Sequence, residues 1–185
     1  MQVDDLGRFL GRRWLFRHLE FELRRGDCLL ITGPNGSGKS TLLRLLALLD
    51  RPTEGSVQIQ PEQLGFAAID QAMYPSLTCQ EHVDFVCDVR GVSDPGVLDA
   101  VELAYAKDVP SQNLSSGMRS RLRLALSLVH QPNVLLLDEP SATLDAAGID
   151  KLDEIIHRQL ENGAVILATN DPAERRWATA ELGLS

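Results

Sequence analysis

The hydrophobic positions of the chain follow two periods, which separate predicted strands from predicted helices. Leu19, Phe21 and Leu23 alternate with polar residues, a pattern typical of a strand with one buried face. Residues 28–31 are all apolar and predict a fully buried strand. Leucines at helical spacing then predict a helix in the segment KSTLLRLLALLD, residues 39–50.

The rest of the chain alternates strands with helices. Short strands are predicted around residues 56–60 and 64–69, followed farther along by a helix at 117–130, a strand at 134–137, a helix at 146–162 and a strand at 164–168. Apolar strands separated by helices predict the α/β class, with a mostly parallel sheet covered on both faces. Residues 78–106 are helical in pattern but polar, with a Gly-Val-Ser-Asp-Pro-Gly break at 91–96, which predicts a small separate helical layer.

Length and composition fit one compact domain of 185 residues with a formal net charge of −8 and a pI near 5.0. No run approaches the ~20 apolar residues of a membrane-spanning helix, and the charged N-terminal segment lacks the apolar core of a signal peptide. We therefore expect a cytoplasmic protein that reaches a membrane only through a partner. The acidic charge argues against nucleic acid as a partner. Three widely separated cysteines predict reduced thiols, with neither a disulfide nor a metal site.

A glycine-rich segment after the buried strand predicts a phosphate-binding loop. The sequence GPNGSGKST fits the pattern G-x-x-x-x-G-K-[ST] between a predicted strand and a predicted helix. Its backbone N–H groups would surround phosphates, Lys39 would reach the β- and γ-phosphates, and the hydroxyl of Ser40 would bind Mg²⁺. The candidate nucleotide-binding residues are Gly33, Pro34, Asn35, Gly36, Ser37, Gly38, Lys39, Ser40 and Thr41.

Two acidic residues follow a second apolar strand, in the segment NVLLLDEPSATLD at residues 133–145. Asp138 would emerge at the carboxyl end of this strand, where it can hold the hydration shell of Mg²⁺. Glu139 would then be placed to polarise an attacking water. Together with the phosphate-binding loop, this pair predicts hydrolysis of a nucleoside triphosphate.

With these residues placed, the chain resembles the nucleotide-binding subunits of ABC transporters over nearly its whole length. The segment LSSGM at residues 114–118 is similar to that family's LSGGQ signature, although Ser116 and Met118 replace glycine and glutamine. The resemblance implies the P-loop NTPase fold of the ABC ATPases in a single domain at 1–185. That fold has an N-terminal antiparallel β part and a helical subdomain, inserted here at about residues 72–130.

The resemblance also implies a dimer that encloses two ATP molecules. In the family, the residues matching Ser115, Ser116 and Gly117 open a helix and close over the γ-phosphate bound by the partner subunit. Asp145, at the end of SATLD, is similar to the D-loop aspartate that couples the two sites. We expect a second ATP-binding subunit, in a homodimer, and integral membrane transporter subunits as partners.

The resemblance also implies roles for a glutamine with the loop after it and for an aromatic residue. Gln71 in IDQAMYPSLT matches the glutamine that senses Mg²⁺ and the attacking water, and residues 72–80 would form much of the groove that receives a membrane subunit. Phe9 is the candidate aromatic to stack on adenine, with Trp14 as the nearby alternative.

The residue after the last predicted apolar strand departs from the family pattern. Asn170 in LATNDP stands where the family has a histidine that bridges the γ-phosphate, the catalytic glutamate and the D-loop. Asparagine can donate an N–H to a phosphate oxygen, but it is shorter and carries no charge. We therefore expect Asn170 to sense the γ-phosphate weakly and turnover to be slow, since the loss of one electrostatic donor costs ~10²–10³-fold in comparable sites.

The leading function is an ATP-hydrolysing subunit that uses ATP and Mg²⁺ to drive dimer closure, and so transport through separate membrane subunits. The short chain resembles the small ATP-binding subunits of bacterial exporters, in particular the haem-exporter type of cytochrome c maturation. One alternative is a soluble ABC-type ATPase acting on DNA or ribosomes, but the chain has neither a long coiled-coil insertion nor two fused halves. A P-loop kinase for a small molecule would not explain the signature.

The densest basic cluster lies in one predicted helix and consists of Arg119, Arg121 and Arg123. Their spacing makes the side chains diverge around the helix, which predicts a solvated face with one structural arginine.

Overall fold

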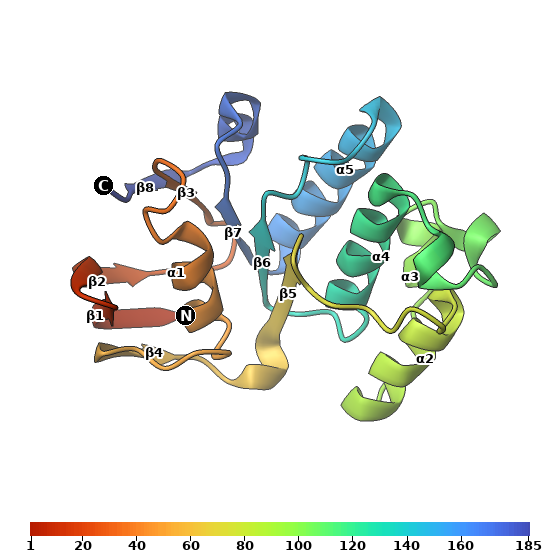
Figure 1. Cartoon of the computed structure of the whole chain (residues 1–185), viewed down its shortest axis with the longest axis horizontal. Coiled ribbons are helices and arrows are strands. Elements are labelled where there is room, and N and C mark those ends of the chain that lie inside the picture. The colour runs from red at the N-terminus through yellow and green to blue at the C-terminus, as the bar shows by residue number, and fades with distance from the viewer.

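Five parallel strands form the central sheet of the computed structural model, which describes all 185 residues (Figure 1). They are β3 (Cys28–Thr32), β5 (Leu64–Ala68), β6 (Val134–Asp138), β7 (Ala164–Ala168) and β8 (Ala180–Gly183), in the order β5-β6-β7-β3-β8. Every pairing is parallel, so all five carboxyl ends lie at one edge of the sheet. Because β6, β7 and β3 are neighbours, the loops that follow them meet at this edge.

Alternate residues of these strands face two separate hydrophobic cores. The helix α1 (Lys39–Leu46) covers one face of the sheet, while α4 (Ser116–Leu128) and α5 (Ala146–Asn162) cover the other. Leu135 and Leu137 of β6 belong to the core that contains α4 and α5, whereas Leu136 belongs to the core that contains α1. Burial on both faces explains why these strands are apolar without alternation.

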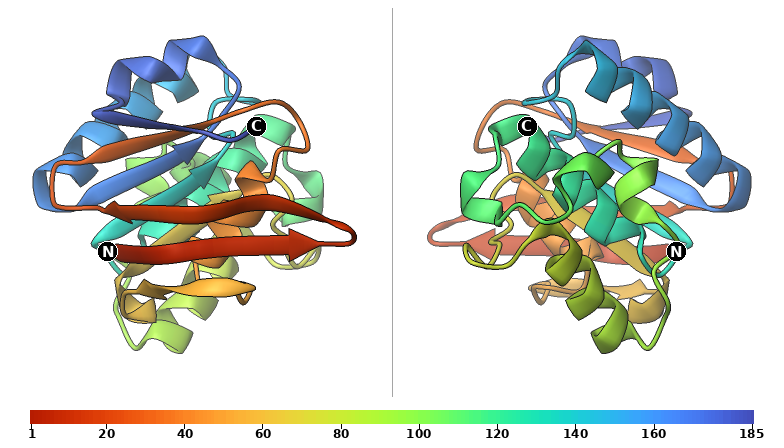
Figure 2. Two further views of the ribbon diagram at one scale, coloured as in Figure 1. Left: turned by 90° about the vertical axis from the view of Figure 1, so that its left-hand side faces the viewer. Right: turned by 90° about the vertical axis from the view of Figure 1, so that its right-hand side faces the viewer.

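A second sheet completes the α1 side of the molecule. It consists of the antiparallel strands β1 (Gln2–Leu10), β2 (Arg13–Glu22) and β4 (Glu54–Gln58), in the order β2-β1-β4. The long β1–β2 hairpin crosses the front of the molecule in the left view of Figure 2. Its buried residues Val3, Leu6 and Phe16 share a core with Leu42 and Leu43 of α1.

A small helical layer lies outside α4 (Figure 1). It contains α2 (Cys79–Arg90), α3 (Val97–Ala100) and the short 3₁₀ turns η2 (Ala104–Ala106) and η3 (Ser111–Asn113). The side chain of Thr78 caps the start of α2 in a reciprocal pair with Glu81, and Gly91 ends the helix in a left-handed conformation with φ +66°. These two signals define α2 and account for the predicted break after it.

The α/β class, the parallel sheet and the helical layer confirm the predictions, with element ends that differ by one or two residues in most cases. The predicted helix at 39–50 is too long, because the chain leaves the helix after Leu46 and Leu48 is left-handed at φ +59°. The strand β8 and the 3₁₀ turns η1 (Pro61–Gln63) and η4 (Pro172–Trp177) are not predicted. None of the helices combines the length and the apolar character that crossing a membrane requires.

Candidate active site

The glycine-rich segment forms a tight loop between β3 and α1. Gly33 has φ +149°, and a Cβ atom there would lie 2.4 Å from the carbonyl oxygen of Leu184. Gly38 has φ +103° and precedes α1 without any side-chain cap, so the first N–H groups of that helix are left for another acceptor. Free N–H groups at a helix N-terminus, combined with the helix dipole, bind anions such as phosphate.

Lys39 joins this loop to the end of β7. The side chain is only 7% exposed, and its Nζ donates to Gly33 O at 2.8 Å and to Asn170 Oδ1 at 3.1 Å. Ser37 contributes a buried hydroxyl oxygen that has no hydrogen-bond partner in the protein. The loop therefore presents a buried cation and a buried, unpartnered hydroxyl group, which is the donor set that a triphosphate requires.

Two carboxylates stand at the end of β6. Burial raises the pKa of Asp138, and the nearby carboxylates of Glu139 and Asp70 raise it further, against the opposing effects of Ser40 and Lys39. Glu139 has φ +48°, a left-handed conformation that is rare outside glycine, and its N–H donates to Ala168 O at 2.8 Å. Strained backbone of this kind persists where the surrounding structure enforces it, often at functional sites.

Asn170 lies at the centre of these groups. Its Nδ2 donates to Glu139 Oε1 at 3.3 Å and to Asn35 Oδ1 at 2.7 Å, while its Oδ1 accepts from Lys39. The carboxamide thus contacts the phosphate-binding loop and the acidic pair at the same time. The structure brings together Asn170, Lys39 and Glu139, as the sequence predicts for the ends of neighbouring strands.

The residues around Asp138 fit a magnesium ion bound with phosphates. The hydrogen bond from the Ser40 hydroxyl lowers the pKa of Asp138, and the excess of negative charge around this buried carboxyl favours a cation. No group of three His, Cys, Asp or Glu side chains converges as a metal site. Mg²⁺ usually takes one or two protein ligands and completes its shell with water and phosphate oxygens, and Ser40 and Asp138 would be those two ligands here.

Gln71 lies apart from this cluster. Its side-chain oxygen is buried without a partner, and its backbone carbonyl accepts from Arg123 Nε at 3.1 Å. No hydrogen bond joins the Gln71 side chain to Ser40, Asp138 or Glu139. The expected approach of Gln71 to the magnesium position is therefore still a prediction.

The signature segment begins α4. The Ser115 side chain caps the helix by accepting from Met118 N at 3.2 Å, and Ser116 and Gly117 form its first turn. A Cβ atom on Gly117 would lie 3.1 Å from the carbonyl oxygen of Thr143, so the segment packs closely on the loop before α5. No hydrogen bond joins Ser115, Ser116 or Gly117 to the phosphate-binding loop of the same chain.

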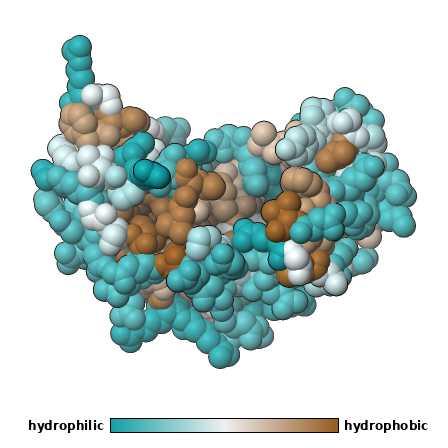
Figure 3. Space-filling view, turned by 90° about the horizontal axis from the view of Figure 1, so that it is seen from below, coloured by the Kyte–Doolittle hydropathy of each residue, from teal (hydrophilic) through white to brown (hydrophobic).

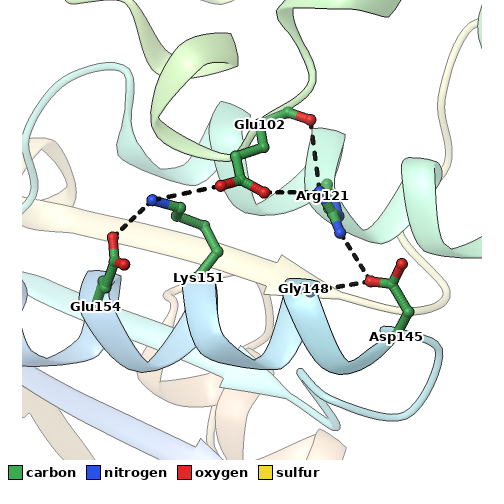
Figure 4. A network of polar contacts seen from close by, with 6 residues as sticks. All are labelled: Glu102, Arg121, Asp145, Gly148, Lys151 and Glu154. Carbon is green, nitrogen blue, oxygen red and sulfur yellow. Dashed lines mark hydrogen bonds and ion pairs between the residues drawn. The ribbon is translucent and has the colours of Figure 1, made fainter.

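Asp145 lies in a network of polar contacts that joins α4 to α5 (Figure 4). Its Oδ1 accepts from Gly148 N at 2.9 Å, which caps α5, and from Arg121 Nη2 at 2.7 Å. The Arg121 hydrogen bond is the main reason that the pKa of Asp145 is lowered. Arg121 also pairs with Glu102 of the helical layer, and Lys151 of α5 pairs with the same carboxylate. The network therefore holds Asp145 against both the signature helix and the helical layer.

All three arginines predicted to diverge around α4 have partners within the protein. Arg119 Nη1 donates to Leu114 O at 2.6 Å, Arg121 pairs with Asp145, and Arg123 bonds to the backbone of Gln71. The prediction of a solvated face with one structural arginine was wrong, because each guanidinium satisfies a backbone or acidic acceptor of a neighbouring loop.

The two aromatic candidates for adenine contact each other on the β1–β2 hairpin. The rings of Phe9 and Trp14 meet edge to face with centroids 5.3 Å apart, and Arg17 lies 4.1 Å over the Trp14 ring. Phe9 is 41% exposed. Arg13, at the start of β2, donates to Gly36 O at 3.1 Å and so ties the hairpin to the phosphate-binding loop. Phe9 is the freer of the two rings for stacking.

A groove of about 680 Å³ opens on the side of the molecule that Figure 3 shows from below, where hydrophobic residues gather on both sides of a hollow. Its walls come mainly from the end of α1, from α2 and from the end of α4, with Leu48, Leu49, Phe85 and Val89 among the exposed apolar residues. Of residues 72–80, which are predicted to form much of the groove for a membrane subunit, only Ala72 lines this cavity, and that role of the segment stays a prediction. The helix packing sets this surface, and the sequence pattern did not reveal it.

Sequence reasoning also missed Glu174, whose carboxylate is buried in η4. The local sequence PAERRW contains three consecutive charged residues and reads as a surface segment. No local signal distinguishes the one side chain that points inward.

Comparisons with known proteins agree with this geometry. Residues 16–142 match the family described as ABC transporter. The chain belongs to the ABC transporter family. It is of the ATP-binding type, with the ATPase activity of that family, and membership implies membrane partners and dimerisation.

Two relatives in the family cover almost all of the chain. The chain is 36% identical to the cytochrome c biogenesis ATP-binding export protein CcmA of Hyphomonas neptunium, over 100% of this chain and 96% of the relative. It is 37% identical to the protein of the same name from Rhodospirillum rubrum, over 95% of this chain and 82% of the relative.

Solved structures of ABC ATPases have the same fold. An ATP-binding subunit of an ABC transporter matches with a TM-score of 0.91 at 24% identity, covering 99% of this chain and 85% of that one. A dimeric ATP-binding cassette in a post-hydrolysis state, bound to ADP and Pi, matches with a TM-score of 0.88 at 22% identity, covering 100% of this chain and 94% of that one. Neither the family match nor these likenesses supports the alternatives of a DNA- or ribosome-acting ATPase or a small-molecule kinase.

Proposed function

We propose that this ABC ATPase powers an export step in cytochrome c biogenesis, by hydrolysing ATP at the edge of the sheet where β3, β6 and β7 end. The observation that carries the proposal is the meeting of Lys39, Glu139 and Asn170, joined by hydrogen bonds of 3.1 and 3.3 Å. The export role is supported by relatives named cytochrome c biogenesis ATP-binding export protein, of which the match covers 96% and 82%.

Each residue of the site has a distinct role in this proposal. Residues 33–41 hold the phosphates through backbone N–H groups, and Lys39 binds the β- and γ-phosphates. Glu139 orients the attacking water and accepts its proton. Mg²⁺, when bound by Ser40 and Asp138, offsets the negative charge of the phosphates. Phe9 stacks on adenine, and Gln71 approaches the site when the helical layer moves.

Asn170 makes the site slow but complete. Its Nδ2 bonds to Glu139 and Asn35, and the same N–H group is the donor that would contact a γ-phosphate oxygen. Compared with the histidine of the family, Asn170 is a shorter donor and cannot carry a positive charge. We expect hydrolysis to proceed with a low kcat.

The proposed working unit is a homodimer bound to integral membrane subunits at the cytoplasmic face of the membrane. Ser115, Ser116, Gly117 and Asp145 make no hydrogen bond to the chain's own phosphate-binding loop, which leaves them for the ATP of a second copy. The groove between α1, α2 and α4, with its exposed Phe85 and Val89, suits an apolar helix of a membrane subunit. The net charge of −8 is unfavourable for nucleic acid.

Phosphate release from ATP and Mg²⁺ tests the ATPase, in the wild type and in Glu139→Gln. The carboxamide of Gln keeps the shape of the side chain but is no base, so we expect Glu139→Gln to bind ATP and to lose turnover by at least ~100-fold. Equal turnover in the two proteins would contradict the role of Glu139.

Deletion of the gene for this protein in its source organism tests the export role. We expect a loss of covalently haem-bearing c-type cytochromes, which the wild-type gene restores and Glu139→Gln does not. Normal cytochrome c levels in the deletion strain would refute the export role without contradicting the proposed ATPase activity.

A further inference from the structure

Glu174 is a buried carboxylate that the proposed mechanism does not use. It lies in η4, four residues after Asn170, and is only 1% exposed, whereas the flanking Arg175 and Arg176 are exposed. A carboxylate in such a position costs free energy unless hydrogen bonds compensate it. Its retention in the core therefore calls for a specific partner.

That partner is Ser141, two residues after Glu139. Oε1 of Glu174 accepts both the backbone N–H of Ser141, at 3.3 Å, and the Ser141 hydroxyl. The other oxygen, Oε2, is buried and has no partner. One carboxylate oxygen thus fixes both the main chain and the side chain of the turn that leaves Glu139.

Thr169 connects the same region to Asn170. It is 2% exposed, its hydroxyl donates to Glu139 Oε2 at 3.3 Å, and it accepts the N–H of Asp171 at 2.9 Å. Burial raises the pKa of Glu174, while the hydrogen bonds from Ser141 act in the opposite direction. Glu174 is therefore tied to the turn after Glu139, and Thr169, the residue before Asn170, is tied to Glu139 by a separate hydrogen bond.

The backbone of Glu139 needs such support. Its left-handed φ of +48° is unfavourable for a residue with a side chain, and local hydrogen bonds must hold it. The N–H of Glu139 is held by Ala168 O, and Glu174 anchors the chain two residues later through Ser141.

We propose that Glu174 is a positioning residue, which clamps the turn after Glu139 onto the loop that bears Asn170. The clamp keeps the carboxylate of Glu139 and the carboxamide of Asn170 in register across the γ-phosphate position. This inference rests on the proposed ATPase function, because its effect on turnover is exerted through Glu139.

A purely structural role would be to fasten η4 to the protein, and a control residue separates the two roles. Asp153 of α5 accepts from Trp177 Nε1 at 2.6 Å and from Arg176 Nε at 3.3 Å, and so fastens the end of η4 without touching Ser141. Asp153→Ala removes this acceptor and perturbs the same turn from its other side.

The decisive measurement is steady-state phosphate release by the full chain in Glu174→Ala, Ser141→Ala, the double variant, Glu174→Gln and Asp153→Ala. We expect Glu174→Ala and Ser141→Ala each to lower kcat by about 10- to 100-fold with KM for ATP changed less than about twofold, and the double variant to lose no more than either. Glu174→Gln retains an acceptor oxygen for Ser141 and should keep kcat within about threefold of the wild type. Wild-type kcat in Glu174→Ala, or an equal loss in Asp153→Ala, would overturn the proposal.

Amide hydrogen exchange of residues 139–145, measured without nucleotide, gives a readout that does not depend on activity. We expect faster exchange there in Glu174→Ala but not in Asp153→Ala. If the wild type releases no phosphate, the proposed ATPase function fails separately. The exchange rates of the two variants still show whether Glu174 holds the turn after Glu139. Unchanged exchange of residues 139–145 in Glu174→Ala would exclude it.

Discussion

Replacing Asn170 tests the centre of the active site most directly. In Asn170→Ala the carboxamide loses its contacts with Asn35 at 2.7 Å, Lys39 at 3.1 Å and Glu139 at 3.3 Å. Lys39 is not orphaned by this change, because its Nζ still donates to Gly33 O at 2.8 Å. Asn170 is itself exposed, so the free energy of unfolding should fall by only about 1 kcal/mol or less.

Turnover should respond much more strongly than stability. Removal of one preorganised donor to developing negative charge typically costs ~10²–10³-fold in kcat. We expect about 100-fold for Asn170→Ala, the lower end of that range, because Lys39 continues to hold the γ-phosphate. Asn170→His, with its longer side chain, should raise kcat about tenfold by the same reasoning.

The assay is phosphate release at saturating ATP between pH 6 and pH 8, with unfolding by urea measured on the same samples. An imidazole has an ordinary pKa of about 6.5 and loses its charge as the pH rises through that value, so the gain in Asn170→His should be larger at pH 6 than at pH 8. Asn162→Ala, which removes an exposed carboxamide at the end of α5, is the control. A kcat of Asn170→Ala within twofold of the wild type would refute the reasoning.

Three other outcomes are expected. Gly33→Ala should abolish ATP binding in a filter or calorimetric assay, because its Cβ would meet the Leu184 carbonyl at 2.4 Å. Gly11→Ala has open space but a left-handed φ of +65°, so it should lose a little stability and still bind ATP normally. Phe9→Ala should raise the Kd for ATP about tenfold, as base stacking on an aromatic ring is worth ~1–3 kcal/mol, and Phe9→Tyr should not. Burial raises the pKa of the Glu174 carboxyl above 4.5, so the native state binds this proton more tightly than the unfolded state does. The free energy of unfolding should therefore fall as the pH rises through the window just above 4.5. Urea titrations should show this slope in the wild type and its loss in Glu174→Gln.

The parts of the site that local chemistry defines could be predicted from the sequence. The phosphate-binding loop, the acidic pair and Asn170 each follow an apolar strand, and parallel pairing of those strands is enough to bring them together. The three cysteines are likewise free and buried, as predicted, and burial raises the pKa of Cys28 to about 12.

The parts that depend on tertiary packing could not be predicted. The short strand β8 has the sequence AELG, with no apolar pattern, and is specified by its pairing with β3. Glu174 is buried between charged neighbours that are exposed, and the groove is lined by helices whose relative placement no local pattern encodes. The side-chain position of Gln71 depends in the same way on how the helical layer sits against α4.

The contacts along α4 give the helix a mechanical role. Its 13 residues span about 20 Å at 1.5 Å per residue, from the groove to the signature segment. Two of its arginine contacts lie near the middle of the helix, two residues apart: Arg123 donates to the backbone of Gln71 and Arg121 to the carboxylate of Asp145. Because both contacts are made by one rigid helix, a displacement of α4 at its groove end would move Gln71, Asp145 and the signature segment together.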